Sequence, residues 1–322
     1  MSASVAPNSA VAANGIDLSA PPRTAPIAIG LPVYNGAEYL SAALESILRQ
    51  TVSDIVVTIS DNGSTDDTPE ICQRFAARDS RVRWFREAEN RGAAWNFNRV
   101  FELSLPFRRP YFKWMAHDDL HDPHYLARCL AVLEENPSVV LCYATTKFIN
   151  GDGSFWQGPL WRDELTLRDP QPERRFRRLL ALSPMHALFG VVRTAALART
   201  GGWGRYASAD RVLVGELVLH GQIVELPEPL FLRRLHPGVS WVKGMRESDY
   251  AVWYDPRNKG RIAIPQLQRA VGYGRAVGRA PLSGSERAKC YFEIVRNIAW
   301  SKRTARHAKR IATSLIAPFT GK

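Results

Sequence analysis

Hydrophobic and polar positions form alternating blocks through the first half of the chain, and these blocks predict strands and helices in turn. Short apolar or β-branched runs are typical of strands that are covered by other elements. The predicted strands cover residues 27–33, 55–60, 81–86 and 111–116. Between them, apolar residues recur at helical spacing, for example at Leu40, Leu44 and Ile47. This order predicts an α/β fold with a doubly wound, mostly parallel sheet flanked by helices.

The pattern is less regular in the second half. Further strands are predicted over 139–144, 188–193 and 223–232, the last at a sheet edge because Pro227 and Pro229 interrupt it. Helices are predicted to open at Pro123, to cover 173–182 and to run from Asp210 to Gly221. Residues 1–26, rich in Ala, Ser and Pro, are expected to form a disordered tail. We expect one domain over 27–245 and a helical extension over 246–322.

Composition adds a strong positive charge to this outline. The chain of 322 residues has a net charge of +12, which indicates an anionic partner such as a phosphorylated substrate, an anionic membrane or nucleic acid. Its four cysteines show no CxxC spacing, so a zinc site and a disulfide scaffold are not expected. We find no apolar run of about 20 residues and no signal peptide pattern, and therefore expect a cytoplasmic protein.

Polar loops follow three of the predicted strands. They contain Tyr34-Asn35-Gly36, the stretch from Asp61 to Asp66, and His117-Asp118-Asp119. Loops after parallel strands meet at one edge of the sheet, where open α/β sheets bind their ligands. Carboxylates at such an edge suit a hard divalent cation and the phosphates it carries. The simpler alternatives are that Asp118 and Asp119 cap a helix and that Asp61 caps a turn.

Several stretches, in their order and spacing over roughly residues 27–240, resemble family 2 glycosyltransferases of the GT-A fold. The matching stretches are 31–35, Gln50, 60–66, 90–92, Asp118-Asp119, Asp210 before an apolar helix, and 234–236. The sequence lacks the GxGxxG and GxxxxGK[ST] patterns of dinucleotide and P-loop sites. The resemblance implies a nucleotide-sugar donor with UDP, GDP or dTDP and a divalent cation, Mn²⁺ or Mg²⁺.

The resemblance also implies roles for individual residues. Donor-binding residues would be Pro32, Tyr34, Asn35, Asp61, Asn90, Gly92, Asp118 and Arg234, and metal ligands would be Asp118, Asp119 and His236. Ala116 stands where the family's D-x-D-D pattern begins with an acidic residue, which leaves open which carboxylate holds the metal, with Asp119 favoured. His236 has the alternative of an ordinary loop histidine.

Asp210 matches the catalytic base of the family. Sugar transfer requires a base for the acceptor hydroxyl, and one carboxylate acting in a single displacement inverts the anomeric centre. Its alternative is a helix N-cap, with Asp163, Glu164 and Glu216 as the next carboxylates to consider.

The sequence therefore predicts an inverting glycosyltransferase that builds a surface polysaccharide or glycolipid. A sugar nucleotidyltransferase and a basic nucleic-acid-binding protein are the alternatives, although nucleic acid is not expected as a partner because no recognition motif is present. Basic residues at 302, 303, 306, 309 and 310, followed by apolar ones, predict contact with an anionic membrane at the inner face of the cell. The arginines of the helix over 173–182 are interpreted as a solvated face.

Overall fold

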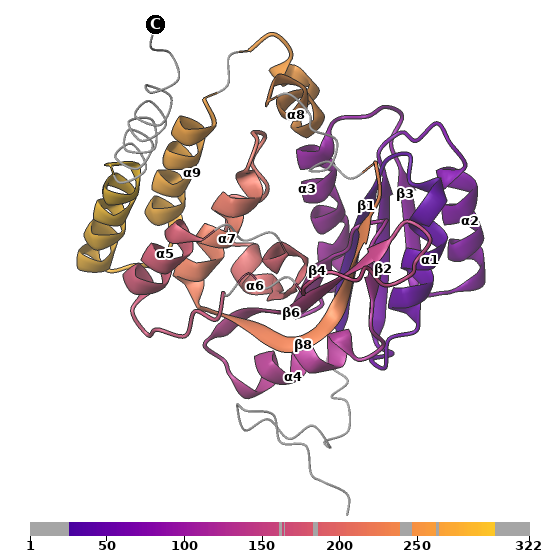
Figure 1. Cartoon of the computed structure of the whole chain (residues 1–322), viewed down its shortest axis with the longest axis horizontal. Coiled ribbons are helices and arrows are strands. Elements are labelled where there is room, and N and C mark those ends of the chain that lie inside the picture. Colours follow the sequence, from indigo (N-terminus) through magenta and orange to yellow (C-terminus); the bar gives the residue numbers. More distant parts are fainter. Residues whose placement is uncertain are drawn as a thin grey trace, which may run out of the picture.

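The computed structural model describes residues 26–160, 163, 165–182, 186–238, 247–261 and 264–299. Its centre is an eight-stranded sheet with the order β3-β2-β1-β4-β7-β6-β8-β5 (Figure 1). The strands are β1 (Ile27–Val33), β2 (Ile55–Asp61), β3 (Val82–Arg86), β4 (Tyr111–Trp114), β5 (Leu120–His121), β6 (Val139–Asn150), β7 (Val191–Arg193) and β8 (Gln222–Leu235).

Helices cover both faces of this sheet. The α-helices are α1 (Ala37–Leu48), α2 (Thr68–Arg78), α3 (Ala93–Ser104), α4 (Tyr125–Glu135), α5 (Pro172–Ala181), α6 (Thr194–Leu197), α7 (Ala209–His220), α8 (Glu247–Tyr254) and α9 (Pro265–Arg279), with a further helix over 284–299. Short 3₁₀ turns are η1 (Leu105–Phe107), η2 (Ala187–Phe189) and η3 (Pro256–Asn258). Apolar residues of α1, α2 and α4 form one core with the sheet, and those of α3, α5, α7 and α9 form a second.

The strands of the first half pair as their composition predicts. β1 lies between β2 and β4, and all three pairings of β1 to β4 are parallel, with Ile29 opposite both Val57 and Lys113. β7 then pairs antiparallel with β4 and β6. Four of the seven strand pairings are parallel, so the predicted mostly parallel sheet flanked by helices is confirmed, with a mixed second half.

The second half departs from the prediction in detail. The two-residue strand β5 was not predicted. It pairs with the end of β8, so β5 and not β8 is the outermost strand on that side of the sheet. The prediction that Pro227 and Pro229 place this strand at the sheet edge is therefore correct only in part. Both prolines lie where the register between β6 and β8 shifts. The helix expected to open at Pro123 begins at Tyr125, and η2 occupies the start of the strand predicted over 188–193.

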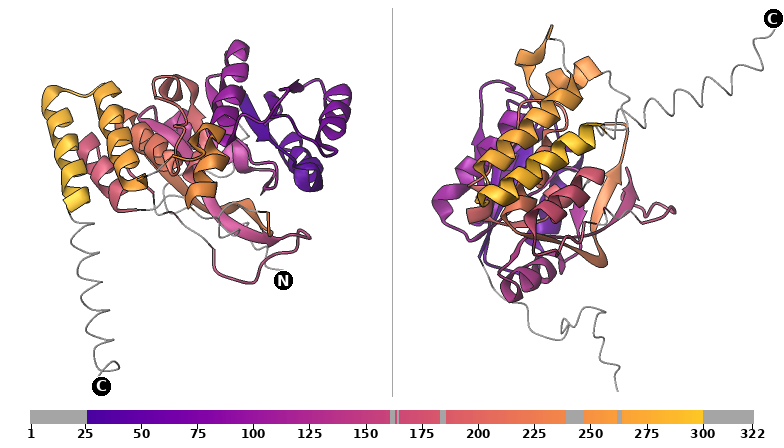
Figure 2. Two further views of the ribbon diagram at one scale, coloured as in Figure 1. Left: turned by 90° about the horizontal axis from the view of Figure 1, so that it is seen from above. Right: turned by 90° about the vertical axis from the view of Figure 1, so that its left-hand side faces the viewer.

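The C-terminal helices pack against the sheet domain. Figure 2 shows α9 and the helix over 284–299 side by side, next to α5, with α8 above α3 in Figure 1. Contacts of α9 with α7 and of α8 with α3 join this extension to the second core. Residues 1–25, the predicted boundary near residue 245 and the basic cluster after residue 301 lie outside the described residues. None of the described helices has the length and apolar content needed to cross a bilayer.

Candidate active site

A cavity of about 770 Å³ opens at the carboxyl ends of β1 and β4. Seven residues predicted from the sequence line it: Pro32, Tyr34, Asn35, Asn90, Asp118, Asp119 and His236. The predicted convergence of the polar loops at one sheet edge is therefore confirmed. Lining residues to which the sequence gave no role include Asn62, Asn96, Phe97, Arg233 and Trp253.

Hydrogen bonds join the loop after β1 to the loop after β2. The N–H of Asn35 donates to Ser64 Oγ at 2.9 Å, and the Asn35 side-chain oxygen accepts from the N–H of Thr65 at 2.8 Å. Asn35 adopts a positive φ of 51°, which asparagine tolerates better than most residues. The neighbouring Tyr34, 42% exposed, is held at the cavity in this way.

Asp61 lies behind this loop and is fully buried. One carboxylate oxygen accepts the N–H of Ser64 at 2.9 Å, and the other lies 3.6 Å from Arg86 Nε. Asp61 is absent from the described lining of the cavity. One oxygen therefore caps the turn, whereas the other has no hydrogen-bond partner among the described residues. Binding of the nucleotide base by Asp61 remains a prediction.

Asn62 and Asn90 join the loop after β2 to the loop after β3. Asn62 Nδ2 donates to Asn90 Oδ1 at 2.9 Å, and Asn90 Oδ1 also accepts the N–H of Gly92 at 2.8 Å. Gly92 has a φ of 88°, and a Cβ there would lie 2.7 Å from both Pro256 Cδ and the carbonyl oxygen of Tyr254. The Asn90-Arg91-Gly92 turn therefore gives α8 and η3 room to approach the cavity.

Asp118 and His236 meet in the cavity from two chain segments. Asp118 Oδ2 lies 3.0 Å from His236 Nε2, and the imidazole ring packs 4.6 Å from the ring of Tyr39. Burial raises the pKa of Asp118, but His117 and the hydrogen bond to His236 outweigh it, so the net shift is downward. The carboxylate is thus ionised at neutral pH.

Asp119 has a different environment from its neighbour. Its side chain is buried, and Oδ1 accepts the N–H of Arg234 at 3.0 Å. Burial, followed by the charge of Asp118, raises the pKa of Asp119. The geometry consequently favours Asp118 over Asp119 as the carboxylate that faces a ligand.

The donor set suits a small divalent cation with few protein ligands. Among the described residues, no group of three or more His, Cys, Asp or Glu is arranged to hold a metal. Mg²⁺ is commonly held by one or two carboxylates together with substrate phosphates and water, and Mn²⁺ accepts similar ligands. Asp118 and His236 supply one oxygen and one nitrogen in contact with the cavity, so they fit such a cation when phosphate oxygens complete its coordination.

Arg234, which was predicted to bind the donor, is absent from the described lining of the cavity. The Arg234 side chain is buried and donates to the carbonyl oxygens of Asp118, Asn150 and Gly151. Arg233 lines the cavity instead. Successive side chains of a strand point to opposite faces, so only one of two adjacent arginines in β8 can face the ligand.

Asp210 lies in the first turn of α7 and contacts α8. Ser208, with a φ of 67°, is the N-cap of α7, so the capping alternative for Asp210 is wrong. Its carboxylate accepts from Tyr254 Oη at 3.5 Å, and Trp253, the next residue along α8, lines the cavity. Burial raises the pKa of Asp210 despite its place near a helix N-terminus. Asp210 itself is not part of the cavity lining formed by described residues.

Two of the carboxylates considered as alternatives to Asp210 are already hydrogen-bonded to other groups. Asp163 accepts the backbone N–H groups of His186 and Ala187 at 2.9 and 3.1 Å. Glu216 forms two hydrogen bonds of 2.8 Å with the guanidinium of Arg279. Glu164, the third, lies outside the described residues.

Comparison with known proteins identifies the family. Residues 28–201, more than half of the chain, match the family described as "Glycosyl transferase family 2". The chain belongs to this family. The predicted family and its GT-A type of fold are thereby confirmed, and a nucleic-acid-binding protein or a nucleotidyltransferase is no longer the better interpretation.

The similar sequences carry the names of glycosyltransferases and polysaccharide synthases, and they match only in part. Chondroitin synthase of Escherichia coli is 32% identical over 145 residues, which is 44% of this chain and 21% of that protein. Glycosyltransferase GlyG of Streptococcus pneumoniae is 28% identical over 130 residues, or 40% of this chain and 42% of that one. The chain therefore spans from about a fifth to about two fifths of these two relatives.

Solved structures share the fold at low sequence identity. TarS 1–349 of S. aureus superposes with a TM-score of 0.60 at 14% identity and covers 87% of this chain and 73% of that one. The mannosyltransferase PcManGT from Pyrobaculum calidifontis, in complex with GDP-Man and Mn²⁺, has a TM-score of 0.51 at 16% identity and covers 91% and 81%. TarS has also been solved with UDP and with UDP-GlcNAc.

Proposed function

We propose that this glycosyltransferase moves a sugar from a nucleoside-diphosphate donor to a hydroxyl acceptor in a polysaccharide or glycolipid, with inversion. The observation that carries the proposal is the contact of Asp118 with His236, at 3.0 Å, in a cavity at the carboxyl end of the sheet. Support also comes from structural relatives bound to UDP, UDP-GlcNAc and GDP-Man, and from relatives named as polysaccharide synthases.

The donor would lie along the loops that line the cavity. Tyr34 and Asn35, with Asn62 and Asn90, offer a ring and side-chain amides to the nucleoside, while Arg233 offers positive charge to phosphates. Asp118 and His236 would hold Mn²⁺ or Mg²⁺, with Asp119 orienting the backbone of Arg234 beside them. When bound, such a cation offsets the negative charge that develops on the departing diphosphate.

Asp210 would accept the proton of the attacking acceptor hydroxyl. Burial raises its pKa, which brings the carboxylate nearer to the basicity that a general base needs. Tyr254 contacts the same carboxylate and orients it from α8. A single displacement by this base leaves the transferred sugar with inverted configuration.

Thermal unfolding against UDP-, GDP- and dTDP-sugars, with and without Mn²⁺ or Mg²⁺, tests this function. A ligand that binds only the folded state raises the melting temperature, so one nucleotide should do so in a metal-dependent way. We expect Asp118→Asn to lose this shift, whereas Asp152→Asn, which changes an exposed carboxylate, should keep it. No shift with any donor, or an undiminished metal-dependent shift in Asp118→Asn, would contradict the proposal.

The expected cellular site follows from the substrates. A glycolipid acceptor would lie in a membrane, so we propose a cytoplasmic enzyme at the inner membrane face. The basic residues from Lys302 to Arg310 and the apolar residues after them would contribute to this attachment.

A further inference from the structure

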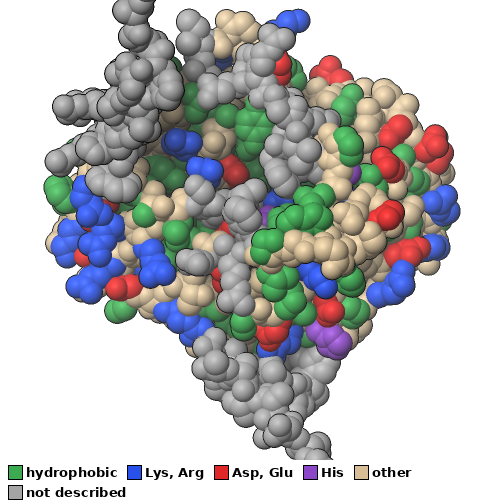
Figure 3. Space-filling view, in the orientation of Figure 1, with side chains coloured by type: hydrophobic (Ala, Val, Ile, Leu, Met, Phe, Trp, Pro, Cys, Tyr) green, Lys and Arg blue, Asp and Glu red, His purple; other side chains and the backbone are tan. Residues whose placement is uncertain are grey.

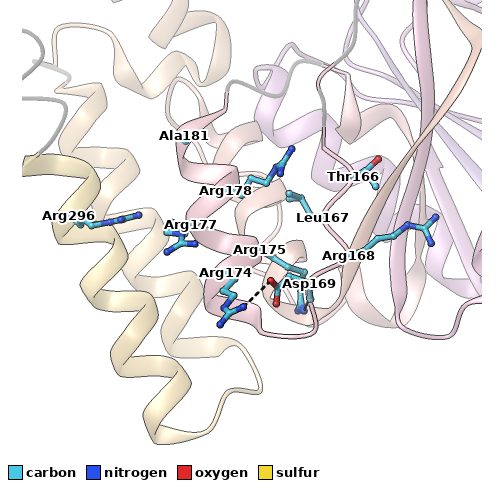
Figure 4. A pocket seen from close by; sticks show the side chains of 10 residues that line it. All are labelled: Thr166, Leu167, Arg168, Asp169, Arg174, Arg175, Arg177, Arg178, Ala181 and Arg296. Carbon is cyan, nitrogen blue, oxygen red and sulfur yellow. Dashed lines mark hydrogen bonds and ion pairs between the residues drawn. The ribbon is translucent and has the colours of Figure 1, made fainter.

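Arginines gather on the side of the molecule formed by α5 and the helix over 284–299, away from the cavity. Six of them, with one aspartate, surround a surface pocket of about 490 Å³: Arg168, Arg174, Arg175, Arg177, Arg178 and Arg296 (Figure 4). A second pocket of similar volume lies beside it and is lined by Arg174, Arg177, Lys289 and Phe292, among others. Figure 3 shows Lys and Arg side chains gathered on this side of the molecule. We call these residues the arginine surface.

Carboxylates do not neutralise the whole of the arginine surface. Asp169 lies 3.8 Å from Arg174, and Glu293 lies 2.6 Å from Arg296. Arg175 is buried and donates to backbone carbonyl groups, so its role is structural. Arg168, Arg177 and Arg178 are exposed and form no ion pair with any residue that the structure describes. The side chains of Arg177 and Arg296 point toward each other from neighbouring helices in Figure 4, an arrangement that favours an anion between them.

The helix over 284–299 carries two apolar faces. One contains Cys290 and Ile294, which are buried against the second core. The other is an exposed stripe of Ala288, Phe292, Val295 and Ala299, at the spacing i, i+4, i+7 and i+11 that places residues on one side of a helix. Phe292 and Val295 are each 64% exposed, which is unusual for large apolar side chains. Within the described part of the chain this stripe stays exposed, which favours contact with a partner.

We propose that the arginine surface and the exposed stripe together dock on an anionic lipid bilayer. Apolar side chains beside Lys and Arg on one helix surface are typical of helices that lie in the membrane interface. Phe292 and Val295 would enter the boundary of the acyl chains, while Arg177 and Arg178 contact lipid phosphates. The sequence continues this pattern beyond residue 299, with five basic residues between 302 and 310 followed by Ile311, Leu315, Ile316 and Phe319. The proposal does not depend on the proposed sugar transfer.

Co-sedimentation of the full chain with vesicles tests the proposal. We expect binding to vesicles of phosphatidylcholine with phosphatidylglycerol, little binding to phosphatidylcholine alone, and weaker binding as NaCl is added, because salt screens the attraction. Arg177→Glu/Arg178→Glu breaks no ion pair within the described residues and should weaken binding by about 30-fold or more. Phe292→Gln/Val295→Gln should weaken it by about ten-fold, because apolar insertion is lost.

A matched control separates the effect of the arginine surface on vesicle binding from the effect of the net charge of the chain. Arg74→Glu/Arg83→Glu makes the same change in net charge at exposed positions of α2 and β3, and it should leave vesicle binding within about two-fold of the original. Donor-induced thermal shifts should be unchanged in all three double variants, so failure of the proposed sugar transfer is distinguishable from failure of docking.

Three outcomes would overturn the proposal. Full vesicle binding by both surface variants would assign binding to the segment after residue 299 instead. A dimer of the original chain in sedimentation velocity, dissolved by Phe292→Gln/Val295→Gln and accompanied by no vesicle binding, would show that a second copy covers the stripe. A thermal shift with inorganic phosphate alone, abolished by Arg177→Glu/Arg178→Glu and without vesicle binding, would show a small-anion site.

Discussion

Asp210 contacts Tyr254 and so connects the first turn of α7 to α8. Ionisation of its carboxylate should affect both the reaction and the stability of the fold. As a general base, Asp210 must be ionised; as a partly buried acid, it is costly to ionise. The pKa of Asp210 is raised by burial, so the ionised form destabilises the folded chain at pH values above that pKa. The cost disappears as pH falls below the unfolded-state pKa of about 3.9.

Replacing Asp210 by Asn should therefore separate activity from stability. We expect turnover to fall by about 100- to 10,000-fold, because the base is lost while the shape is kept. We expect the urea midpoint at pH 7 to stay the same or to rise, because a buried charge has been removed. In the original enzyme, the acid limb of the pH–rate profile should lie above pH 3.8, the usual pKa of an aspartate.

Steady-state transfer assays, urea unfolding and donor thermal shifts measure turnover, stability and donor binding for the original enzyme and for Asp210→Asn. Donor affinity should be nearly unchanged in Asp210→Asn. Near-normal turnover in this variant would place the base elsewhere, and a large loss of stability with proportionate loss of activity would indicate a structural role only.

Single residues also show where sequence inference stops. The order of Asp61, Asn90, Asp118 and His236 helped to predict the family and seven of the residues that line the cavity. It could not separate Arg233 from Arg234, because the phase of a strand relative to the cavity depends on its register with β6. Nor could it show that one oxygen of Asp61 accepts the N–H of Ser64 while the other is buried without a hydrogen-bond partner among the described residues.

At the scale of elements, strands made of long apolar runs could be predicted from the sequence. Very short strands, and contacts that depend on tertiary packing, could not. β1 has the predicted bounds, and β2 and β3 begin or end within one residue of them. The continuous β-branched run of β2 suits a covered strand. β5 has only two residues, and it exists because the end of β8 pairs with it. Nothing in the sequence of α8 indicated that Trp253 would line the cavity, since that contact depends on how α8 docks.

The docking of α8 and η3 depends on Gly92, and Gly92→Ala should disturb it. The new Cβ would lie 2.7 Å from Pro256 Cδ and from the Tyr254 carbonyl oxygen, at a φ of 88° that alanine rarely adopts. We expect a loss of about 2–4 kcal/mol of stability, from backbone strain and overpacking together, and reduced turnover because Trp253 and Tyr254 move.

Gly260→Ala is the matched control for this substitution. Its φ of 74° imposes similar strain, but no described atom lies within 4 Å of the added Cβ. Urea unfolding should show a loss of only about 1 kcal/mol, and turnover should hardly change. Equal losses of stability and activity in the two variants would show that strain alone matters and that contact with η3 does not.

For the molecule as a whole, the sheet divides two cores, and the pattern of the sequence predicted this arrangement better than it predicted the cavity. The alternation of strands and helices sets which faces are apolar, whereas the cavity is closed by segments more than 100 residues apart, such as the loop after β1 and α8. The charge of +12 indicated an anionic partner but could not place it, because only folding brings α5 beside the helix over 284–299.

Between the two cores lies Lys113, a fully buried cation in β4 that should shape the stability of the entire chain. Its Nζ donates to the carbonyl oxygens of Trp114 and Phe189. Burial lowers the pKa of Lys113 to about 7. In the unfolded chain the pKa is about 10.4, so above pH 7 the unfolded state binds more protons and stability rises with pH.

Other groups also titrate between pH 7 and 8.5. Burial raises the pKa of Asp119 to about 7, and this carboxyl lowers stability as pH rises, opposite to Lys113. Burial raises the pKa of Cys72 to about 12, so its thiol lowers stability as pH rises through about 8.5, the pKa of the unfolded state. Burial lowers the pKa of His121 and His186, but these groups affect stability only below about pH 6.5. We therefore expect Lys113 alone to contribute a rise of about 1–2 kcal/mol in the free energy of unfolding between pH 7 and pH 8.5, and a matched variant is needed to separate it.

Lys113→Met should flatten this rise, because Met fills a similar volume and does not titrate. Urea unfolding at pH 7.0, 7.75 and 8.5 measures the slope for the original chain, for Lys113→Met and for Lys259→Met, which changes an exposed lysine. The original chain and Lys259→Met should share one slope, and the change over this range in Lys113→Met should be lower by about 1–2 kcal/mol. The same slope in all three proteins would mean that Lys113 does not couple the fold to protons in that range.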